Sequence, residues 1–179
     1  MNLKVVKEED MTPALDAAIR RGLAVCFPED AEAFSQTRAW HGSLAAWSVV
    51  LEHEGEVIAH AGVVDRTLRV GEREVRVAGV QNVYVLPEFR RRGLTSRLME
   101  KAMTEAAARG FDVGLLFCVP ELERVYLRSG WISLGPRETL RVDETGAEVP
   151  LPAKNIAMFH PLRQPNFPHG LIHLQGNDW

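Results

Sequence analysis

The sequence predicts an α/β domain in which helices flank a mixed, mostly antiparallel β-sheet. The first observation behind this class is that apolar runs at strand spacing, separated by short glycine-containing turns, fill residues 47–86. The second is a helical apolar pattern over residues 94–109, followed by the continuous apolar run 113–119. A continuous apolar run is typical of a buried parallel strand, so we expect one parallel pair among antiparallel strands.

The N-terminal part is expected to hold one short strand and one capped helix. Residues 3–6 alternate weakly in hydropathy and form the strand. Thr12 caps the helix, Pro13 takes its first position, and Gly22 ends it. Residues 28–46 are interpreted as irregular or helical.

Three consecutive antiparallel strands follow, and they are expected at residues 47–53, 57–70 and 75–86. Glu54-Gly55 and Gly71-Glu72 supply the two turns between them. Gly62 marks a bulge in the second of these strands, because glycine inside a strand often accompanies an irregular register.

The second half begins with the helix over 94–109, which Gly110 stops. The strand 113–119 comes next, and then a short helix over 120–128 that Gly130 closes. The remaining chain is expected as a strand within 131–142, a polar loop over 143–154, a last strand at 155–161 and a tail over 163–179. The tail is too apolar to be free, so we expect it to pack back on the domain.

Composition limits the classes of protein. A chain of 179 residues can bury one good core, so we expect a single domain over 1–179. The net charge of −3 gives no support for nucleic-acid binding, and no apolar run is long enough to span a bilayer. No signal-peptide pattern opens the sequence, which favours a cytoplasmic protein with Cys26 and Cys118 as free thiols. No metal is expected, because no cluster of Cys, His and carboxylates has zinc spacing.

The most informative stretch runs from Val83 to Leu98, where a strand ends at a proline, a short basic turn follows and a helix begins. Such a strand–turn–helix aims several backbone N–H groups and a helix N-terminus at one point, and this geometry binds pyrophosphate. The arginines of the turn add positive charge beside that point. Taken alone, a basic turn before a helix can also be a solvated surface turn.

This turn resembles motif A of the GCN5-related N-acetyltransferases (GNAT), which reads Arg/Gln-x-x-Gly-x-Gly/Ala. Arg90, Gly93 and Thr95 fill the three marked places. Thr95 departs from the family's Gly or Ala, and its β-branched side chain leaves less room beside a phosphate while offering a hydroxyl donor. The order of the expected elements is also similar to the GNAT acyl-CoA N-acyltransferase fold over nearly the whole chain. The resemblance therefore implies that fold, with acetyl-CoA as its cosubstrate.

In this family the strand before the turn splays from its parallel neighbour, and its backbone pairs with the pantetheine arm of the cosubstrate. The resemblance gives that role to Val83, Tyr84 and Val85, with the amide of Val85 polarising the thioester carbonyl. Core packing is the alternative for Val83 and Val85, and the two roles are compatible. The remaining residues that the resemblance assigns to cofactor binding, mainly through backbone N–H groups on the pyrophosphate, are Arg90, Arg91, Arg92, Gly93, Leu94, Thr95 and Ser96.

A second resemblance lies in residues 120–131, because GNAT motif B carries a Tyr on a short helix followed by x-x-x-Gly-Phe/Trp. Tyr126, Gly130 and Trp131 fit this pattern. In the family the Tyr hydroxyl returns a proton to the leaving thiolate, and a phenol suits that role because its pKa of about 10 is near that of a thiol. The alternative is a Tyr that only packs between helix and sheet.

An amine acceptor also needs a base, because its ammonium form cannot attack a thioester. Gln81 lies where a Glu would suit this role, and an amide cannot take a proton. His60 is a candidate on a strand beside the site, although a hydrogen-bonded structural histidine is the favoured interpretation. A water-linked group or the chain terminus are the other candidates. Cys118 is not expected as a nucleophile, because no His or Asn partner is marked for it.

The tail resembles the aminoglycoside 2′-N-acetyltransferase branch of the family, whose chains end near Asp-x-Trp, whereas this sequence ends Asp178-Trp179. Likeness to that branch also lies at 58–61 and 126–131. A tail folded over the acceptor mouth would place negative charge and a stacking surface there, which suits a polycationic amine. A tail that only covers an apolar patch is the alternative. The segments similar to the nodulation acyltransferases, which transfer long acyl chains to an amino sugar, are residues 38–40 and 68–72.

These resemblances imply transfer of an acetyl group from acetyl-CoA to a primary amine of a small molecule, such as an aminoglycoside or amino sugar. The attack is expected to be direct, without a covalent enzyme intermediate. Trp40, Gln81, Asp178 and Trp179 are expected at the acceptor. A non-catalytic acyl-CoA-binding module and a transferase of longer acyl chains are the alternatives. We expect no nucleic-acid or membrane partner, and a homodimer is compatible with the sequence.

Overall fold

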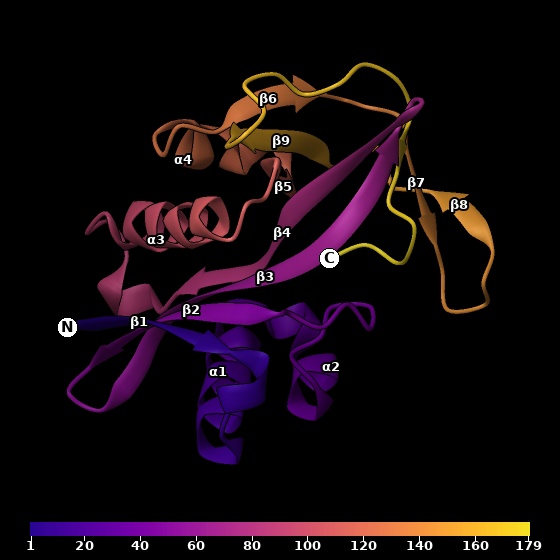
Figure 1. Cartoon of the computed structure of the whole chain (residues 1–179). Coiled ribbons are helices and arrows are strands. Elements are labelled where there is room, and N and C mark those ends of the chain that lie inside the picture. The colour runs from indigo at the N-terminus through magenta and orange to yellow at the C-terminus, as the bar shows by residue number, and fades with distance from the viewer.

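The computed structural model describes all residues of the chain, 1–179, and its ten strands form one sheet with helices on both faces (Figure 1). The helices and strands are, in chain order, β1 (Asn2–Lys7), α1 (Pro13–Cys26), α2 (Ala31–Gln36), β2 (Trp47–His53), β3 (Glu56–Val70), β4 (Arg73–Val85), α3 (Leu94–Ala108), β5 (Val113–Cys118), α4 (Glu123–Leu127), β6 (Ile132–Gly135), β7 (Thr139–Val142), β8 (Glu148–Pro150), β9 (Ile156–Pro161) and β10 (Ile172–His173).

The sheet branches at the long strand β3. One path runs β1-β2-β3-β4-β5-β9-β6, and the other leaves β3 through β10 to β7 and β8. β3 can serve both paths because β2 pairs only with its first half, up to Val63, whereas β10 pairs with Arg69 and Val70 at its far end. All pairs are antiparallel except β4 with β5 and β10 with β7. The predicted trio of antiparallel strands and the predicted parallel neighbour are therefore confirmed.

Helices cover the two faces of the central strands. α1 and α2 lie on one face and α3 lies on the other (Figure 1). α3 buries a stripe at helical spacing that includes Leu98, Ala102 and Ala106. This stripe belongs to the larger apolar core, together with residues of the sheet, α1 and α2. Burying apolar side chains in this way is the dominant favourable contribution to folding.

Gly22 does not end the first helix, which continues to Cys26. The prediction was wrong because Gly22 is a packing residue and not a helix stop. It lies where α1 crosses β4, and a Cβ atom there would overlap the Tyr84 ring and hydroxyl. Glycine is thus required by a close approach between helix and sheet, although it costs about 1 kcal/mol of helix propensity.

The predicted strand within 131–142 is two strands, and the predicted loop after it contains a third. Gly135, at φ +64°, and the following Pro136 break the chain between β6 and β7. β6 then joins β9 at one edge of the sheet, whereas β7 joins β10 and β8 on the other branch. Gly135-Pro136 is a local turn signal that the prediction missed. The different sheet partners of the two strands, by contrast, leave no local pattern, because both segments have ordinary strand composition.

A β-bulge interrupts the pairing of β3 with β4 near Gly62. Gly62 lies opposite Gln81 and His60 lies opposite Tyr84, so β4 carries one residue more than β3 between these pairs. Gly62 therefore sits beside the irregularity, but the extra residue is on β4, where Asn82 adopts φ +54°. Such a bulge bends a strand and redirects its backbone groups.

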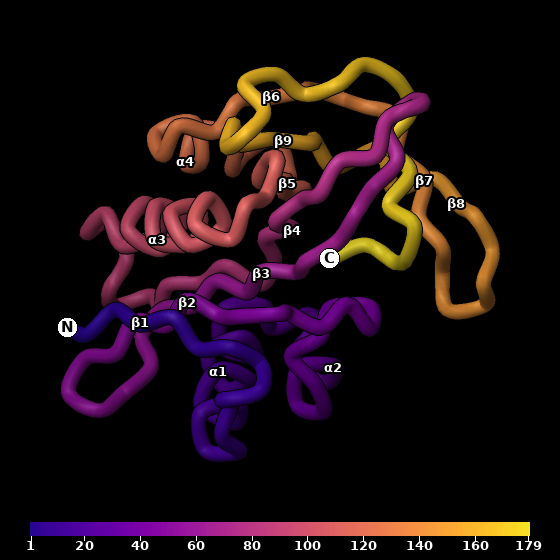
Figure 2. Tube along the Cα trace, viewed as in Figure 1, coloured from indigo at the N-terminus to yellow at the C-terminus, as the bar shows by residue number.

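The tail returns along the second branch of the sheet. It passes the turn between β3 and β4, where the Gly71 N–H donates to the Leu171 carbonyl at 3.0 Å, and ends near the middle of β3 (Figure 2). Phe167, Leu174 and Trp179 are buried in a second, smaller apolar core with residues of β3, β4 and β5. No helix has the length and hydropathy to cross a membrane.

Candidate active site between diverging strands

A gap opens where β4 and β5 diverge. The two strands pair only at Val77–Gly79 and Val113–Leu115, although β4 continues to Val85 and β5 to Cys118. Residues 80–85 therefore have no strand neighbour on the β5 side. Backbone groups along such an edge can pair with an extended ligand.

The amide of Val85 points into this gap. The N–H of Leu86 donates to the carbonyl of Ile58 on β3 at 2.9 Å. Successive residues of a strand direct their N–H groups to opposite sides, so the N–H of Val85 points away from β3. Its carbonyl lies on the same side and accepts from Arg90 Nε at 3.0 Å. An amide in this position can polarise a carbonyl oxygen that enters the gap.

The turn after β4 leaves the N-terminus of α3 open to an anion. Arg91 and Gly93 both adopt positive φ, +60° and +71°. No side chain caps α3, and its first turn carries no acidic residue. α1 differs, because the Thr12 hydroxyl accepts from the Leu15 N–H at 3.2 Å. The first amides of α3 are therefore available to a phosphate, which the positive end of the helix dipole favours.

Two arginine side chains brace this turn. Arg90 holds the carbonyl of Val85, and Arg92 Nη2 donates to the carbonyl of Glu88 at 3.1 Å. Arg91 is exposed. The gap and the turn thus bring together every residue predicted to bind the cofactor: Val83, Tyr84, Val85, Arg90, Arg91, Arg92, Gly93, Leu94, Thr95 and Ser96.

Tyr126 lies on α4 beside the end of β5. Its ring is buried and meets Trp131 edge-on, with ring centroids 6.4 Å apart. The Ser129 hydroxyl donates to the Ser96 hydroxyl at 3.0 Å, which ties the end of α4 to the first turn of α3. Burial, with a smaller contribution from Cys118, raises the pKa of Tyr126 well above its ordinary value. Its hydroxyl therefore keeps its proton at neutral pH, and the raised pKa makes it a weaker acid than a free phenol.

His60 is enclosed within the protein and uses both ring nitrogens. Nδ1 lies 2.9 Å from the Asn82 carbonyl oxygen and Nε2 lies 3.0 Å from the Ser48 hydroxyl. A carbonyl oxygen only accepts, so Nδ1 carries the proton and the ring is neutral with Nε2 as acceptor. Burial lowers the pKa of His60 to about 4. This geometry favours a structural role for His60, which supports the bulge at Asn82. It does not favour a role as the base.

The residues predicted at the acceptor lie on the face of β4 that is turned away from α3. Gln81 is buried, and its Nε2 donates to the Ser43 carbonyl at 2.7 Å while its Oε1 is buried without a partner. Trp40 stacks between Phe34 and His41, with ring centroids 5.7 Å and 4.5 Å away. Both Trp40 and Ser43 belong to the segment after α2, which therefore walls this side of the gap.

The end of the tail lies against the same side. A Cβ on Gly79 would overlap the Trp179 indole, so the ring lies directly on Gly79. Gly79 is the last residue of β4 that pairs with β5. Phe117 of β5 contacts the same ring at 5.9 Å between centroids. Asp178 accepts from Arg141 Nη1 at 2.9 Å and lies 2.8 Å from His41 Nδ1. The carboxylate of Asp178 is therefore already paired with a cation.

Sequence reasoning missed the groups that hold this tail. Arg66 donates to the Asn177 carbonyl and lies 5.1 Å from the Trp179 ring centroid. The Ser43 hydroxyl donates to the Asp178 carbonyl at 2.8 Å. Arg141, on β7, is the further cation. These residues come from three distant segments, and no local pattern in the sequence joins them to the tail.

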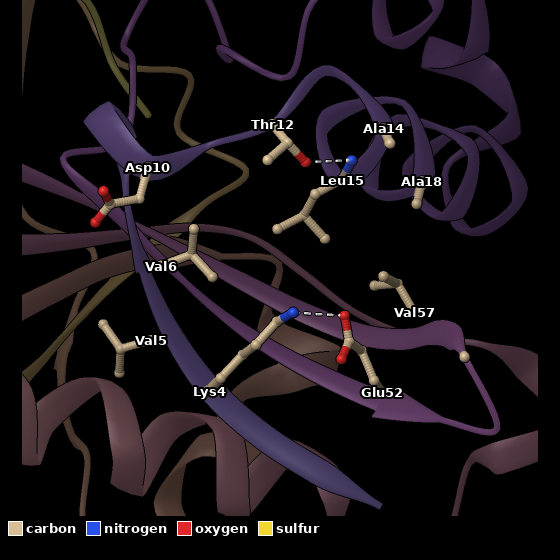
Figure 3. Close-up of a pocket in the computed structure, with 11 residues that line it drawn as sticks. Lys4, Val5, Val6, Asp10, Thr12, Ala14, Leu15, Ala18, Glu52 and Val57 are labelled. Carbon is tan, nitrogen blue, oxygen red and sulfur yellow. Dashed lines mark hydrogen bonds and ion pairs between the residues drawn. The ribbon is translucent and has the colours of Figure 1, made fainter.

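A separate hollow of about 510 Å³ lies between β1, α1 and the β2–β3 turn (Figure 3). Val6, Leu15 and Val57 give it an apolar lining, and Lys4 pairs with Glu52 across it at 2.7 Å. β1 lies at an edge of the sheet, three strands from β4. This hollow therefore forms no part of the gap.

A parallel pair that diverges beside an uncapped helix N-terminus defines the fold of acyl-CoA N-acyltransferases. The sequence model of the acetyltransferase (GNAT) domain matches residues 4–133. The chain therefore belongs to the GNAT acetyltransferase family, and its enzyme class is the acetyl-CoA-dependent N-acetyltransferases. A relative, the aminoglycoside 2′-N-acetyltransferase of Mycolicibacterium fortuitum, is 28% identical over 131 residues, which cover 73% of this chain and 67% of that protein.

Solved structures share the fold. The GNAT N-acetyltransferase YhbS of Escherichia coli, in complex with CoA, has a TM-score of 0.67 at 18% identity, over 97% of this chain and 89% of that one. A GNAT acetyltransferase of Brucella melitensis, in complex with acetyl-CoA, has a TM-score of 0.62 at 19% identity, over 96% and 94%. A GCN5-related N-acetyltransferase of Kribbella flavida matches 75% of this chain at a TM-score of 0.55 and 23% identity, but the match spans only 34% of that longer protein.

Proposed function

We propose that this protein transfers the acetyl group of acetyl-CoA to a primary amine of a small molecule by direct attack. The observation that carries the proposal is the unpaired edge of β4 at residues 80–85, which leads directly to the uncapped N-terminus of α3. One extended ligand with a pyrophosphate at one end fits both features. Bound CoA in the Escherichia coli relative and bound acetyl-CoA in the Brucella relative support the same donor.

In this proposal the backbone groups of Val83 and Val85 pair with the pantetheine arm. Tyr84 lies between them with its backbone groups directed to β3 and its ring turned toward Gly22 of α1, so it holds the strand in place. The pyrophosphate binds the N–H groups of residues 91–96, where Arg91 adds positive charge. Gly93 is open to solvent on the side where a Cβ would lie, so the turn has room for a phosphate.

The chemical step follows from the groups at the end of the gap. The amine nitrogen attacks the thioester carbonyl carbon, and the N–H of Val85 stabilises the negative charge that develops on the carbonyl oxygen. The carbon–sulfur bond then breaks, and Tyr126 donates its proton to the leaving thiolate. Positioning of the two reactants supplies much of the rate, so no covalent enzyme intermediate is needed.

The acceptor side is formed by Trp40, Gln81, Asp178 and Trp179. We propose an aminoglycoside or amino sugar as acceptor, since the Mycolicibacterium fortuitum relative is an aminoglycoside 2′-N-acetyltransferase. Both rings are already covered, Trp40 by Phe34 and His41 and Trp179 by Gly79 and Arg66. They therefore shape this side by packing and leave no free face on which a sugar ring could stack. Because Arg141 already neutralises Asp178, this carboxylate serves better to orient a neighbour than to attract a polycation.

Calorimetric titration with acetyl-CoA, followed by a free-thiol assay over aminoglycosides, amino sugars and polyamines, tests the proposal. Binding of acetyl-CoA with thiol release for one amine class supports it. Binding without thiol release for any amine would point to an acyl-CoA-binding module. Tighter binding of long-chain acyl-CoA in competition would point to a transferase of longer acyl chains.

A further inference from the structure

We propose that His41, oriented by Asp178, is the base that removes the proton from the acceptor amine. The inference rests on the proposed acetyl transfer, because only an ammonium that must become a nucleophile needs such a base. Gln81 cannot take a proton, and both nitrogens of His60 are occupied inside the protein. His41 is a titratable side chain on the acceptor side of β4 that remains open to solvent.

The contact with Asp178 fixes the tautomer of His41. Nδ1 lies 2.8 Å from Asp178 Oδ1, and a carboxylate only accepts, so Nδ1 carries the hydrogen. Nε2 of the neutral ring then holds a lone pair. The ring stacks on Trp40 at 4.5 Å between centroids and keeps 36% of its side chain exposed. A carboxylate that holds imidazole in this way orients it and stabilises the imidazolium that forms.

Two hydrogen bonds hold the segment of His41 against the end of β4. Asn82 Nδ2 donates to the Arg38 carbonyl at 2.7 Å, and Gln81 Nε2 donates to the Ser43 carbonyl at 2.7 Å. Both donors lie directly before Val83, where the backbone begins to pair with the pantetheine arm in the proposed complex. The segment follows α2, on the face opposite α3 (Figure 1). An amine must approach from this face, since the donor occupies the α3 side.

Charged groups beside His41 come from the tail, from β7 and from β3. Asp178 faces it from the tail, and Arg141 of β7 binds the same carboxylate at 2.9 Å. Arg66 of β3 donates to the neighbouring Asn177 carbonyl. The unpartnered Oε1 of Gln81 is a second acceptor on this wall, suited to an N–H of the amine. The His41 ring thus contacts one anion, the Asp178 carboxylate, whereas the two arginines bind the tail and not the ring itself.

The proton balance is simple. His41 Nε2 takes one proton from the ammonium, directly or through one water, and the freed lone pair forms the carbon–nitrogen bond. The thiolate that leaves takes a proton from Tyr126. The nitrogen, which is positively charged after the attack, loses its second proton to the Tyr126 oxygen, directly or through water, and becomes the amide nitrogen. The His41 imidazolium releases its proton to solvent, so the enzyme returns to its starting state.

His41→Asn is the variant that tests the proposal. Asparagine tolerates positive φ, which His41 adopts at +44°, and its amide can still donate to Asp178, but it accepts no proton. With tobramycin and glucosamine as acceptors at pH 7 we expect kcat/KM to fall about a hundredfold with an unchanged Kd for acetyl-CoA. With hydroxylamine, which is largely unprotonated at pH 7, we expect a loss below about threefold, since no base is needed.

The pH dependence of kcat/KM and two further variants test the same proposal. For the wild type, kcat/KM should depend less steeply on pH than for His41→Asn, which can use only the fraction of the amine that is already unprotonated. Asp178→Asn should lower kcat/KM about tenfold or more, because the tautomer is no longer fixed. His169→Asn, at an exposed histidine of the tail, should match the wild type.

Two outcomes distinguish a failure of this inference from a failure of the proposed function. If wild-type protein turns over amines and His41→Asn keeps its kcat/KM and pH profile, or loses as much with hydroxylamine as with tobramycin, His41 is not the base and acetyl transfer stands. If the wild type binds acetyl-CoA but releases no thiol with any amine, hydroxylamine included, the proposed function fails and this inference fails with it.

Discussion

Tyr126 is the residue whose single hydroxyl the proposed reaction uses most directly. Tyr126→Phe removes the oxygen and keeps the ring that packs on Trp131. We expect turnover to fall about a hundredfold, the usual contribution of a positioned acid. The Kd for acetyl-CoA and the free energy of unfolding should stay close to those of the wild type. Steady-state thiol release beside calorimetry measures both, and equal turnover in the variant would remove Tyr126 from the mechanism.

His60 makes stability depend on pH. Its pKa is lowered to about 4 in the folded protein by burial, whereas an unfolded chain gives about 6.5. The unfolded state therefore binds the proton more readily, so this contribution is fully present above pH 6.5 and is lost as pH falls toward 4. The loss between pH 7 and pH 4 should be about 3 kcal/mol.

Urea unfolding at pH 7, 5.5 and 4 measures this dependence of stability on pH, with His60→Gln as the comparison. The variant should be less stable at pH 7, because a buried hydrogen-bonded ring has been replaced. It should nevertheless lose less free energy of unfolding on acidification than the wild type does. Parallel losses in the two proteins would show that His60 does not carry the acid sensitivity.

Single residues differ in how far the sequence reveals them. The positions of Gly93 in the turn and of Tyr126 on the short helix could be predicted, because each sits in a local motif, and their roles stay predictions. The contacts of His41 and Arg141 with Asp178 could not be predicted, since Asp178 comes from the far end of the chain. The burial of His60 also follows from packing and not from its neighbours in sequence.

At the scale of elements, the turn before α3 gives a prediction about cosubstrate binding. Gly93 takes φ +71° and a Cβ there would meet no atom within 4 Å. Gly93→Ala therefore adds about 1 kcal/mol of backbone strain without a clash. We expect the Kd for acetyl-CoA to rise about tenfold, because relief of that strain moves the N–H groups that bind the pyrophosphate in the proposed complex.

Gly146 provides a matched control in the turn between β7 and β8. It takes φ +84°, and a Cβ there also meets nothing within 4 Å. Gly146→Ala should lower the free energy of unfolding by a similar amount and leave the Kd for acetyl-CoA unchanged. If both variants weakened acetyl-CoA binding equally, the effect would be general destabilisation and not the turn.

The predicted elements matched the structure where an apolar period repeats over many residues. They differed from it where tertiary packing sets the end of an element. The runs in β3, β4 and α3 could be read from the sequence, because each has many residues on one period. The end of α1 could not, because Gly22 is explained only by Tyr84 across the helix–sheet interface. The break at Gly135 likewise separates strands whose partners lie far away in the sequence.

At the scale of the whole molecule, the branch of the sheet joins the tail to the acceptor side. β10 pairs with both β3 and β7, so the last residues are led back to the middle of β4. The sequence predicts the three antiparallel strands and their parallel neighbour, but a two-residue strand such as β10 leaves no pattern in the sequence. The tail packing was expected from its apolar composition alone.

Trp179 should therefore stabilise the fold as well as shape the acceptor side. It is buried against Gly79 and Phe117 and covered by Arg66. Trp179→Ala should lower the free energy of unfolding by about 3 kcal/mol, the usual cost of truncating a buried aromatic residue. The KM for the amine should rise, whereas the Kd for acetyl-CoA should change less than about twofold, because the donor edge lies on the other side of β4.

Leu171→Ala is the control within the same tail, since Leu171 is among the exposed apolar side chains and its substitution should cost no more than about 0.5 kcal/mol. Urea unfolding and acceptor kinetics on the two variants separate a tail that is part of the structure from one that merely lies on it. An unchanged free energy of unfolding for Trp179→Ala would mean that the tail is loosely held. His41 would then lack a fixed Asp178, because the same segment carries both residues 178 and 179.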